Sequence, residues 1–238
     1  MSFPTFKQSI LPMTYNMEQV NADGYRYYRC DGGNYPSITT VLGCHPSGEW
    51  VNEWIKNVGV ERAERIRNRA ARLGSAVHDL AERYLGNTLT QRDIMKALPD
   101  VKLRFKSLRK FLDGVSEVFL LERGVYSDIL GLAGTIDFFG VYNGEITAVD
   151  FKTASGIRTE EEIQGYFAQV TFYAMAILER YPAFITKMPN IAIVIAVDGV
   201  DEPQIFLKSG KDFIRNSLTY VKECDIIYTT MNPDRILT

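Results

Sequence analysis

The spacing of apolar residues predicts a long amphipathic helix in the first third of the chain. Between Val60 and Leu85, apolar side chains recur every three or four residues, as they do along one face of an α-helix. They are Ile66, Ala70, Leu73, Val77, Leu80 and Tyr84. Gly74, His78 and Glu82 form an adjacent stripe, one helical turn apart. We therefore expect one helix to carry a core face beside a stripe of chemically distinctive residues.

Further along the chain, segments rich in β-branched and aromatic residues predict three strands near residues 115–126, 130–142 and 145–153. Asn143-Gly144 lies between the last two segments. This dipeptide is favoured in two-residue type I′ turns, because both central residues must accept a positive φ. The sequence therefore predicts a β-hairpin whose register is fixed by its turn.

The register of this hairpin brings two carboxylates together. Counting outward from the turn places Asp137 opposite Asp150, and directly opposed side chains have Cβ atoms roughly 5 Å apart. The two acids would repel each other unless a cation lies between them. Side chains alternate between the two faces of a strand, so Lys152 lies on the same face as Asp150. The same count places Lys152 opposite Thr135. A bound divalent metal ion is one interpretation and a solvated strand face is the other; an apolar opposite face favours the metal.

The remaining pattern completes an α, β, β, β, α, β order, which indicates an α/β fold. Helices are expected at 101–112, 160–180 and 211–224, with another from Gly48 that Gly59 interrupts. Strands are expected at 191–197 and 204–207, and short extended pieces at 25–29 and 37–42. At 238 residues, with 46% hydrophobic and 24% charged residues, the chain suits one well-cored domain.

Four motifs follow one another along the chain. They are G-x-x-x-H-x-x-x-E at 74–82, G-x-I-D at 134–137, D-x-K-T at 150–153 and Q-x-x-x-Y at 169–173. This order resembles the PD-(D/E)xK nuclease superfamily in its RecB-like branch. With PSITTVL at 36–42 and AQVTFYAMAI at 168–177, most of the chain is similar to the mitochondrial genome maintenance exonuclease group and its phage-encoded relatives.

The resemblance implies a restriction-endonuclease-like core, with a mixed central sheet flanked by helices and an added helical N-terminal region. Residues 60–224 would form the catalytic core of a single nuclease domain. Residues 1–59 would be an N-terminal extension with substrate-contacting elements, and residues 225–238 a C-terminal tail.

Residue by residue, the resemblance also implies a catalytic metal site. His78, Asp137 and Asp150 would be metal ligands, together with the backbone carbonyl of Phe151. Lys152 would position or activate the attacking water and stabilise charge on the phosphate. Spacing alone favours a different interpretation, in which His78 is a hydrogen-bonded residue at the edge of the core.

Further site residues follow from the same motifs. Gln169 and Tyr173 would flank the catalytic site from their helix, and Thr153 would contact the nucleic acid. Spacing alone also fits an ordinary helix in which this glutamine and tyrosine lie at the boundary between core and solvent. The family has one more acidic residue before the hairpin, and Glu122 and Asp128 both fit that role.

Two basic segments flank the predicted active helix. Residues 60–72 hold five arginines against two glutamates, and residues 101–110 hold five basic residues and no acid. Phosphate contacts are expected from Arg62, Arg65, Arg69, Arg72, Lys102 and Lys106, although solvated helix faces would show the same pattern. Trp50, Trp54 and Tyr84 could stack on unpaired bases or pack in the core. The net charge of −2 and the pI of about 5.8 require any basic track to be local.

Composition limits the cofactors and the location. Three widely spaced cysteines lack the pattern of an iron–sulfur cluster, and no phosphate-binding loop for a nucleotide cofactor occurs. Carboxylate ligands suit Mg²⁺ or Mn²⁺, and a histidine ligand favours Mn²⁺ slightly. No apolar run approaches a membrane span, and the N-terminus resembles neither a signal nor a transit peptide. We expect a location in the cytoplasm of a bacterium or a phage-infected cell, without membrane contact.

Together these features predict a Mg²⁺- or Mn²⁺-dependent DNA exonuclease. The family resemblance supplies the substrate, single-stranded DNA or DNA with free ends or flaps, and a role in DNA replication, recombination or repair. A structure-specific endonuclease or an RNase on the same fold is an alternative. A nucleic-acid-binding recombination partner without catalysis is another, although opposed carboxylates would repel phosphate. No protein partner is indicated by the sequence.

Overall fold

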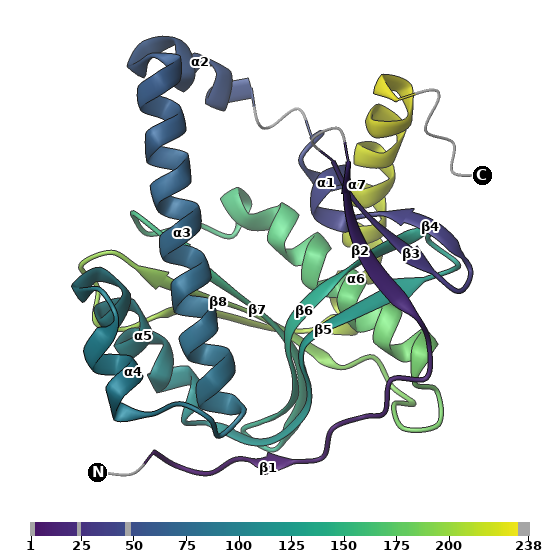
Figure 1. Ribbon diagram of the computed structural model, residues 1–238. Helices are drawn as coiled ribbons and strands as arrows, with labels where there is room; N and C mark the ends of the chain where they lie inside the picture. Colours follow the sequence, from purple (N-terminus) through teal and green to yellow (C-terminus); the bar gives the residue numbers. More distant parts are fainter. Residues whose placement is uncertain (1–2, 23–24, 46–48, 233–238) are drawn as a thin grey trace.

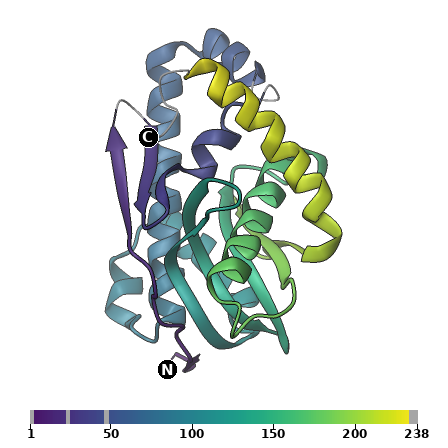
Figure 2. The same ribbon diagram turned by 90° about the vertical axis from the view of Figure 1, so that its right-hand side faces the viewer.

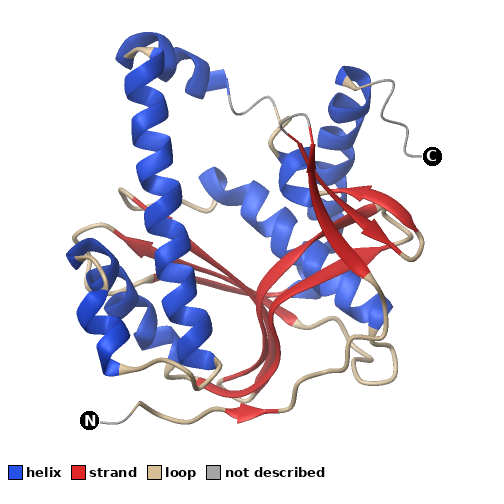
Figure 3. Ribbon diagram, in the orientation of Figure 1, coloured by secondary structure: helices blue, strands red, loops and turns tan. Residues whose placement is uncertain are grey.

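The computed structural model describes residues 3–22, 25–45 and 49–232. A mixed six-stranded sheet lies between two groups of helices (Figures 1 and 3). Its strand order is β1-β5-β6-β7-β8-β9. The strands are β1 (Lys7–Gln8), β5 (Val115–Ser127), β6 (Leu132–Tyr142), β7 (Glu145–Ala154), β8 (Asn190–Val197) and β9 (Gln204–Ser209). β1 is parallel to β5 and β7 is parallel to β8, whereas the other neighbours are antiparallel.

Helices cover both faces of this sheet, and a hydrophobic core fills each layer. On one face lie α3 (Val60–Leu85), α4 (Gln91–Lys96) and α5 (Pro99–Leu112). On the other face lie a short 3₁₀ turn (Glu161–Ile163), α6 (Gln164–Arg180) and α7 (Gly210–Met231). Among the described helices, none combines the length and the apolar character needed to cross a membrane.

The N-terminal region adds a small sheet and a projecting pair of helices. The antiparallel sheet consists of β2 (Met17–Ala22), β3 (Tyr25–Cys30) and β4 (Gly33–Pro36), followed by α1 (Ile38–Leu42). α2 (Glu49–Val58) lies at the outer end of α3, which extends beyond the sheet (Figures 1 and 2). We call α2 and residues 60–73 of α3 the helical arm.

Most predicted elements are present, with differences at the ends of the chain. The helix predicted from Val60 to Leu85 has these bounds, and Gly59 separates it from α2 with φ 84°. The expected extended piece at 37–42 is wrong, because Ile38–Leu42 form α1 with Ile38 and Val41 buried in the core. The last helix ends at Met231 rather than at Cys224.

The hairpin register is confirmed close to its turn and fails farther away. The pairs run from Tyr142 and Glu145 to Phe138 and Val149, as counted from the turn. There the ladder of β6 and β7 ends, so the expected pairs of Asp137 with Asp150 and of Thr135 with Lys152 are not formed. β6 continues along β5, while β7 continues along β8. The predicted acids therefore lie where the two strands separate.

Candidate metal centre

Three side chains from three elements place potential metal ligands close together. His78 comes from α3, Glu122 from β5 and Asp137 from β6, and one ligand atom of each lies within 4.8 Å of the others. His78 Nδ1 is 3.5 Å from Asp137 Oδ1 and 3.9 Å from Glu122 Oε1. Imidazole nitrogen and carboxylate oxygen together suit Mn²⁺ and related divalent ions. This donor set therefore fits the metal that the sequence predicts.

The separation of β6 and β7 gives Asp137 its position. The backbone ladder between β6 and β7 ends at Phe138. Next to it, the side chain of Asp137 takes the place of a backbone acceptor, because its Oδ2 accepts a hydrogen bond of 2.6 Å from the Phe151 amide. This contact leaves Asp137 Oδ1 beside His78. Phe151 contacts Asp137 through its backbone N–H group. A metal bond through the Phe151 carbonyl stays a prediction.

Glu122 has an unusual backbone conformation for a residue within a strand. Its φ is 43°, in the left-handed region that residues other than glycine rarely adopt. The neighbouring residues Leu121 and Arg123 pair with Phe138 and Ile136, so Glu122 lies across from Asp137 at a position where the ladder is interrupted without a shift of register. Such strain is common at functional sites, where the surrounding structure maintains it.

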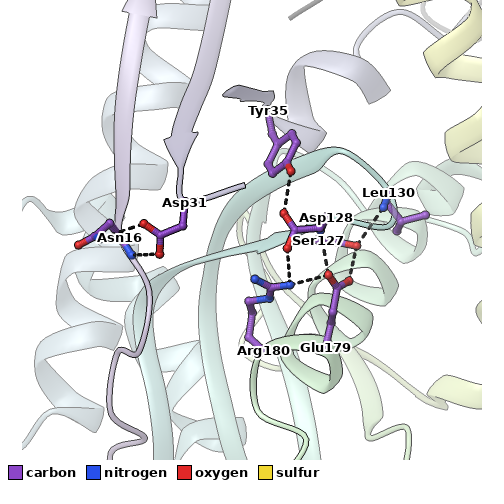
Figure 4. A network of polar contacts seen from close by, with 8 residues as sticks. All are labelled: Asn16, Asp31, Tyr35, Ser127, Asp128, Leu130, Glu179 and Arg180. Atoms are coloured by element: carbon purple, nitrogen blue, oxygen red, sulfur yellow. Dashed lines mark hydrogen bonds and ion pairs between the residues drawn. The ribbon is translucent and has the colours of Figure 1, made fainter. Parts of the chain in front are cut away.

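Asp128, the other acidic residue considered for this role, belongs to a different network (Figure 4). It accepts hydrogen bonds from Tyr35 Oη and Arg180 Nη2, both at 2.7 Å. Glu179 joins the same network through Arg180 and Ser127. Asp128 thus connects the β5–β6 loop to α6 and to the small sheet, while Glu122 lies beside His78 and Asp137.

A second group of polar side chains joins β7 to α6. Lys152 Nζ is 2.5 Å from Asp150 Oδ2, which confirms that these two residues share a face of the strand. Gln169 Nε2 donates to Asp150 Oδ1 at 3.0 Å and to Tyr173 Oη at 2.9 Å. Gln169 Oε1 accepts from Lys152 at 3.4 Å. The structure therefore brings together four of the residues that the motifs select.

Burial and neighbouring charges raise several pKa values in this site. Burial, followed by the charge of Asp137, raises the pKa of Glu122 to about 8. Burial opposes the charged form of His78, but the hydrogen bond and charge of Asp137 outweigh it and raise its pKa to about 9. Burial also raises the pKa of Asp150, although Lys152 opposes this effect. The metal-free site therefore retains protons that a cation would displace.

A cavity of about 560 Å³ opens beside these groups. His78, Glu122 and Lys152 line it, together with Gly74 and Thr153. Its remaining lining residues are Ala70, Ala71, Ser75, Asp79, Glu82 and Phe151. A methyl group at Gly74 would approach Thr153 Oγ1 to 3.5 Å, an ordinary contact, so protein packing does not require a glycine there. The missing side chain instead keeps the cavity open.

The predicted nucleic-acid contacts are spread over the helical arm and α5. Arg65 pairs with Glu61, and Arg69 pairs with Asp100 at 3.2 Å. Arg62, Arg72 and Lys106 are exposed, Lys102 donates to the Met95 carbonyl, and Trp54 is half-buried. Tyr84 is buried and donates to Asp113, so of the two alternatives for this residue the structure supports packing in the core. The Trp50 side chain lies outside the described part of the chain.

One contact near Lys152 was missed by the sequence motifs. The Tyr166 ring centroid lies 5.0 Å from Lys152 Nζ. Tyr166 precedes Gln169 by three residues, and this helical spacing was the available signal. Glu82, one helical turn beyond His78 as the sequence predicts, lines the same cavity.

Comparisons with known proteins give little beyond this geometry. No model of a known protein family matches the chain, and no curated protein matches it. A solved structure from Eubacterium rectale, described as a "Putative exonuclease", is similar with a TM-score of 0.47 and 15% sequence identity. The similarity covers 71% of this chain and 69% of that chain.

Proposed function

We propose that the protein is a metal-dependent nuclease of the PD-(D/E)xK type that hydrolyses phosphodiester bonds in DNA. One observation carries the proposal: His78, Glu122 and Asp137 converge within 4.8 Å beside the Asp150–Lys152 ion pair. A purely structural acid cluster gains nothing from this crowding, because the carboxylates repel one another. A divalent ion would offset that repulsion.

The side chains have separable roles in this reaction. His78, Glu122 and Asp137 would hold Mg²⁺ or Mn²⁺. When bound, the metal ion lowers the pKa of a water ligand and neutralises phosphate oxygens. Asp150 can also serve as a ligand while bound to Lys152 and Gln169, because a carboxylate offers about four lone pairs.

Lys152 would supply a fixed positive charge for the phosphate. Its Nζ lies beside Asp150, and the residue lines the open cavity. An ammonium group held in place before the reaction stabilises developing negative charge without reorganisation, which is usually a large catalytic term. Gln169 fixes this group by bridging Asp150, Lys152 and Tyr173.

The substrate is best described as a single strand with a free end. The helical arm carries exposed arginines, and its residues Ala70 and Ala71 line the cavity, an arrangement that suits a strand of phosphates. We propose an exonuclease that trims single-stranded ends or flaps during DNA replication, recombination or repair. This finer assignment follows the motif resemblance, whereas the proposed absence of an iron–sulfur cluster and the proposed cytoplasmic location follow from the composition.

The proposal is tested with linear single strands labelled at the 5′ or the 3′ end, incubated with Mg²⁺, Mn²⁺ or EDTA. We expect short labelled products with either metal and none with EDTA, and the label that is released first gives the direction. A circular single strand of the same sequence should resist. Digestion of the circle would indicate an endonuclease, and binding without turnover under every condition would contradict the proposal.

A further inference from the structure

The face of α6 that meets β7 carries one residue more than the Q-x-x-x-Y motif selects. Tyr166, Gln169 and Tyr173 are spaced by three and four residues, so they lie on one stripe of the helix. Gln169 and Tyr173 belong to the hydrogen-bonded group around Asp150. Tyr166 makes a different contact, since its ring lies 5.0 Å from the ammonium nitrogen of Lys152.

This geometry suits a cation–π interaction. A lysine ammonium within about 6 Å of a tyrosine ring centroid is attracted by the ring's negative face, and the attraction is stronger away from water. The Lys152 side chain is only 22% exposed, so solvent weakens the contact little. The Tyr166 ring is itself held in place, because it packs against the hydrophobic core on the α6 side of the sheet.

The contact also preserves hydrogen-bonding capacity. A lysine ammonium has three N–H donors. Gln169 Oε1 accepts a hydrogen bond from Lys152 at 3.4 Å, and Asp150 Oδ2 forms an ion pair with it at 2.5 Å, so these two oxygens occupy at most two of the donors. The face of an aromatic ring attracts the charge without a strong acceptor atom, so one donor remains for a further partner. A carboxylate or amide at position 166 would compete for that donor.

We propose that Tyr166 is a positioning residue for the nuclease reaction. Its ring holds the Lys152 ammonium beside Asp150 with one N–H available to the scissile phosphate or the attacking water. Tyr166 does not contact the reacting atoms itself. The inference rests on the proposed function, and it adds a determinant of Lys152 geometry that the motifs do not contain.

The test compares Tyr166→Phe, which keeps the ring, with Tyr166→Leu, which keeps apolar bulk without the π face. Tyr220→Leu, at a half-buried tyrosine of α7 that packs against the same hydrophobic core as Tyr166, is the control for loss of a tyrosine elsewhere. We expect Tyr166→Leu to lower kcat by about three- to thirtyfold with little change in KM, as the usual strength of cation–π contacts implies. Tyr166→Phe and the control should stay close to the wild type.

A spectroscopic measurement separates the contact from the activity. In lysine-labelled protein, the Lys152 Cε protons should be shifted upfield by the ring current in the wild type and in Tyr166→Phe, but not in Tyr166→Leu. The resonance is assigned by its loss in Lys152→Arg. An inactive wild type with this shift intact would overturn the proposed function, whereas absence of the shift would overturn the contact itself.

Three kinetic results would also contradict the role of Tyr166. Full activity of Tyr166→Leu would show that the ring is dispensable. An equal loss in Tyr166→Phe would assign the effect to the hydroxyl group. A rise in KM alone would place Tyr166 against the substrate and not behind Lys152.

Discussion

At the residue scale, two acidic residues six positions apart lie in different surroundings. Glu122 lies beside His78 and Asp137, whereas Asp128 is bound by Tyr35 and Arg180. Sequence reasoning could not choose between them, because both are acids near the same strand. The choice depends on a positive φ at Glu122 and on long-range contacts of Asp128, which no local pattern encodes.

Substitution of these two acids should give contrasting results. Glu122→Gln should lower nuclease activity by about tenfold or more, since it removes a charged ligand that the metal requires. Asp128→Asn should keep the activity but lower the free energy of unfolding by about 1–3 kcal/mol, because it weakens a charged hydrogen bond to Arg180. Cleavage rates at saturating Mn²⁺ and urea melts measure both effects. The reverse pattern would assign the wrong acid to the site.

A substitution at Gly74 should affect stability and substrate binding in different ways. Gly74→Ala should leave the free energy of unfolding unchanged or raise it by up to about 1 kcal/mol, because alanine is favoured over glycine within helices and meets no close atom here. The same methyl group enters the cavity, so substrate affinity should fall. Thermal melts and KM measurements test this, and a destabilised variant or one with unchanged KM would contradict it.

Protons and the metal ion should compete for the centre. Because the pKa of Glu122 is raised to about 8 and that of His78 to about 9, the metal-free fold is favoured by bound protons. This stabilisation is complete below the ordinary pKa values of about 4.5 and 6.5 and is lost as the pH rises toward 9. Mn²⁺ needs the deprotonated forms.

Apparent Mn²⁺ affinity, measured by calorimetry, should therefore increase between pH 6.5 and 8.5, by up to about tenfold per pH unit for each displaced proton. Binding should release protons, which buffers of different ionisation enthalpy detect. The pH dependence should be shallower in Glu122→Gln. An affinity that is independent of pH would show that these groups do not bind the ion.

At the scale of elements, local patterns predicted what local physics determines. The 26-residue helix α3 follows from apolar periodicity, and the first five pairs of the β6–β7 hairpin follow from the Asn143-Gly144 turn. Farther from the turn, counting failed because the sheet separates at Asp137, whose side chain binds the Phe151 amide. α1 was missed because its β-branched sequence favours a strand, while packing of Ile38 and Val41 stabilises a helix.

The helical arm offers a prediction about electrostatics. Arg69 already pairs with Asp100, whereas Arg62 and Arg72 form no ion pair among the described residues. Arg62→Gln and Arg72→Gln should each weaken binding of a single strand and reduce its salt dependence by roughly 0.7 in the log–log slope per lost phosphate contact. Arg69→Gln should have a smaller effect. Equal salt slopes in all three variants and the wild type would argue against strand binding by the arm.

At the scale of the whole molecule, the fold builds the candidate site from both faces of the central sheet. α3 contributes His78 from one face of the sheet, and α6 contributes Gln169 from the other. Both reach one site because β6 and β7 separate between them. The order of elements could be predicted from the sequence, but this opening depends on long-range packing and could not.

The proposed activity depends on the charge of Lys152 beside a metal ion. The most direct measurement is the cleavage rate of a labelled linear single strand by the wild type and by Lys152→Met, each with saturating Mn²⁺ or with EDTA. We predict metal-dependent cleavage by the wild type and a rate lower by about a hundredfold or more in Lys152→Met, with Mn²⁺ binding retained. Cleavage in EDTA, or equal rates for the two proteins, would contradict the account.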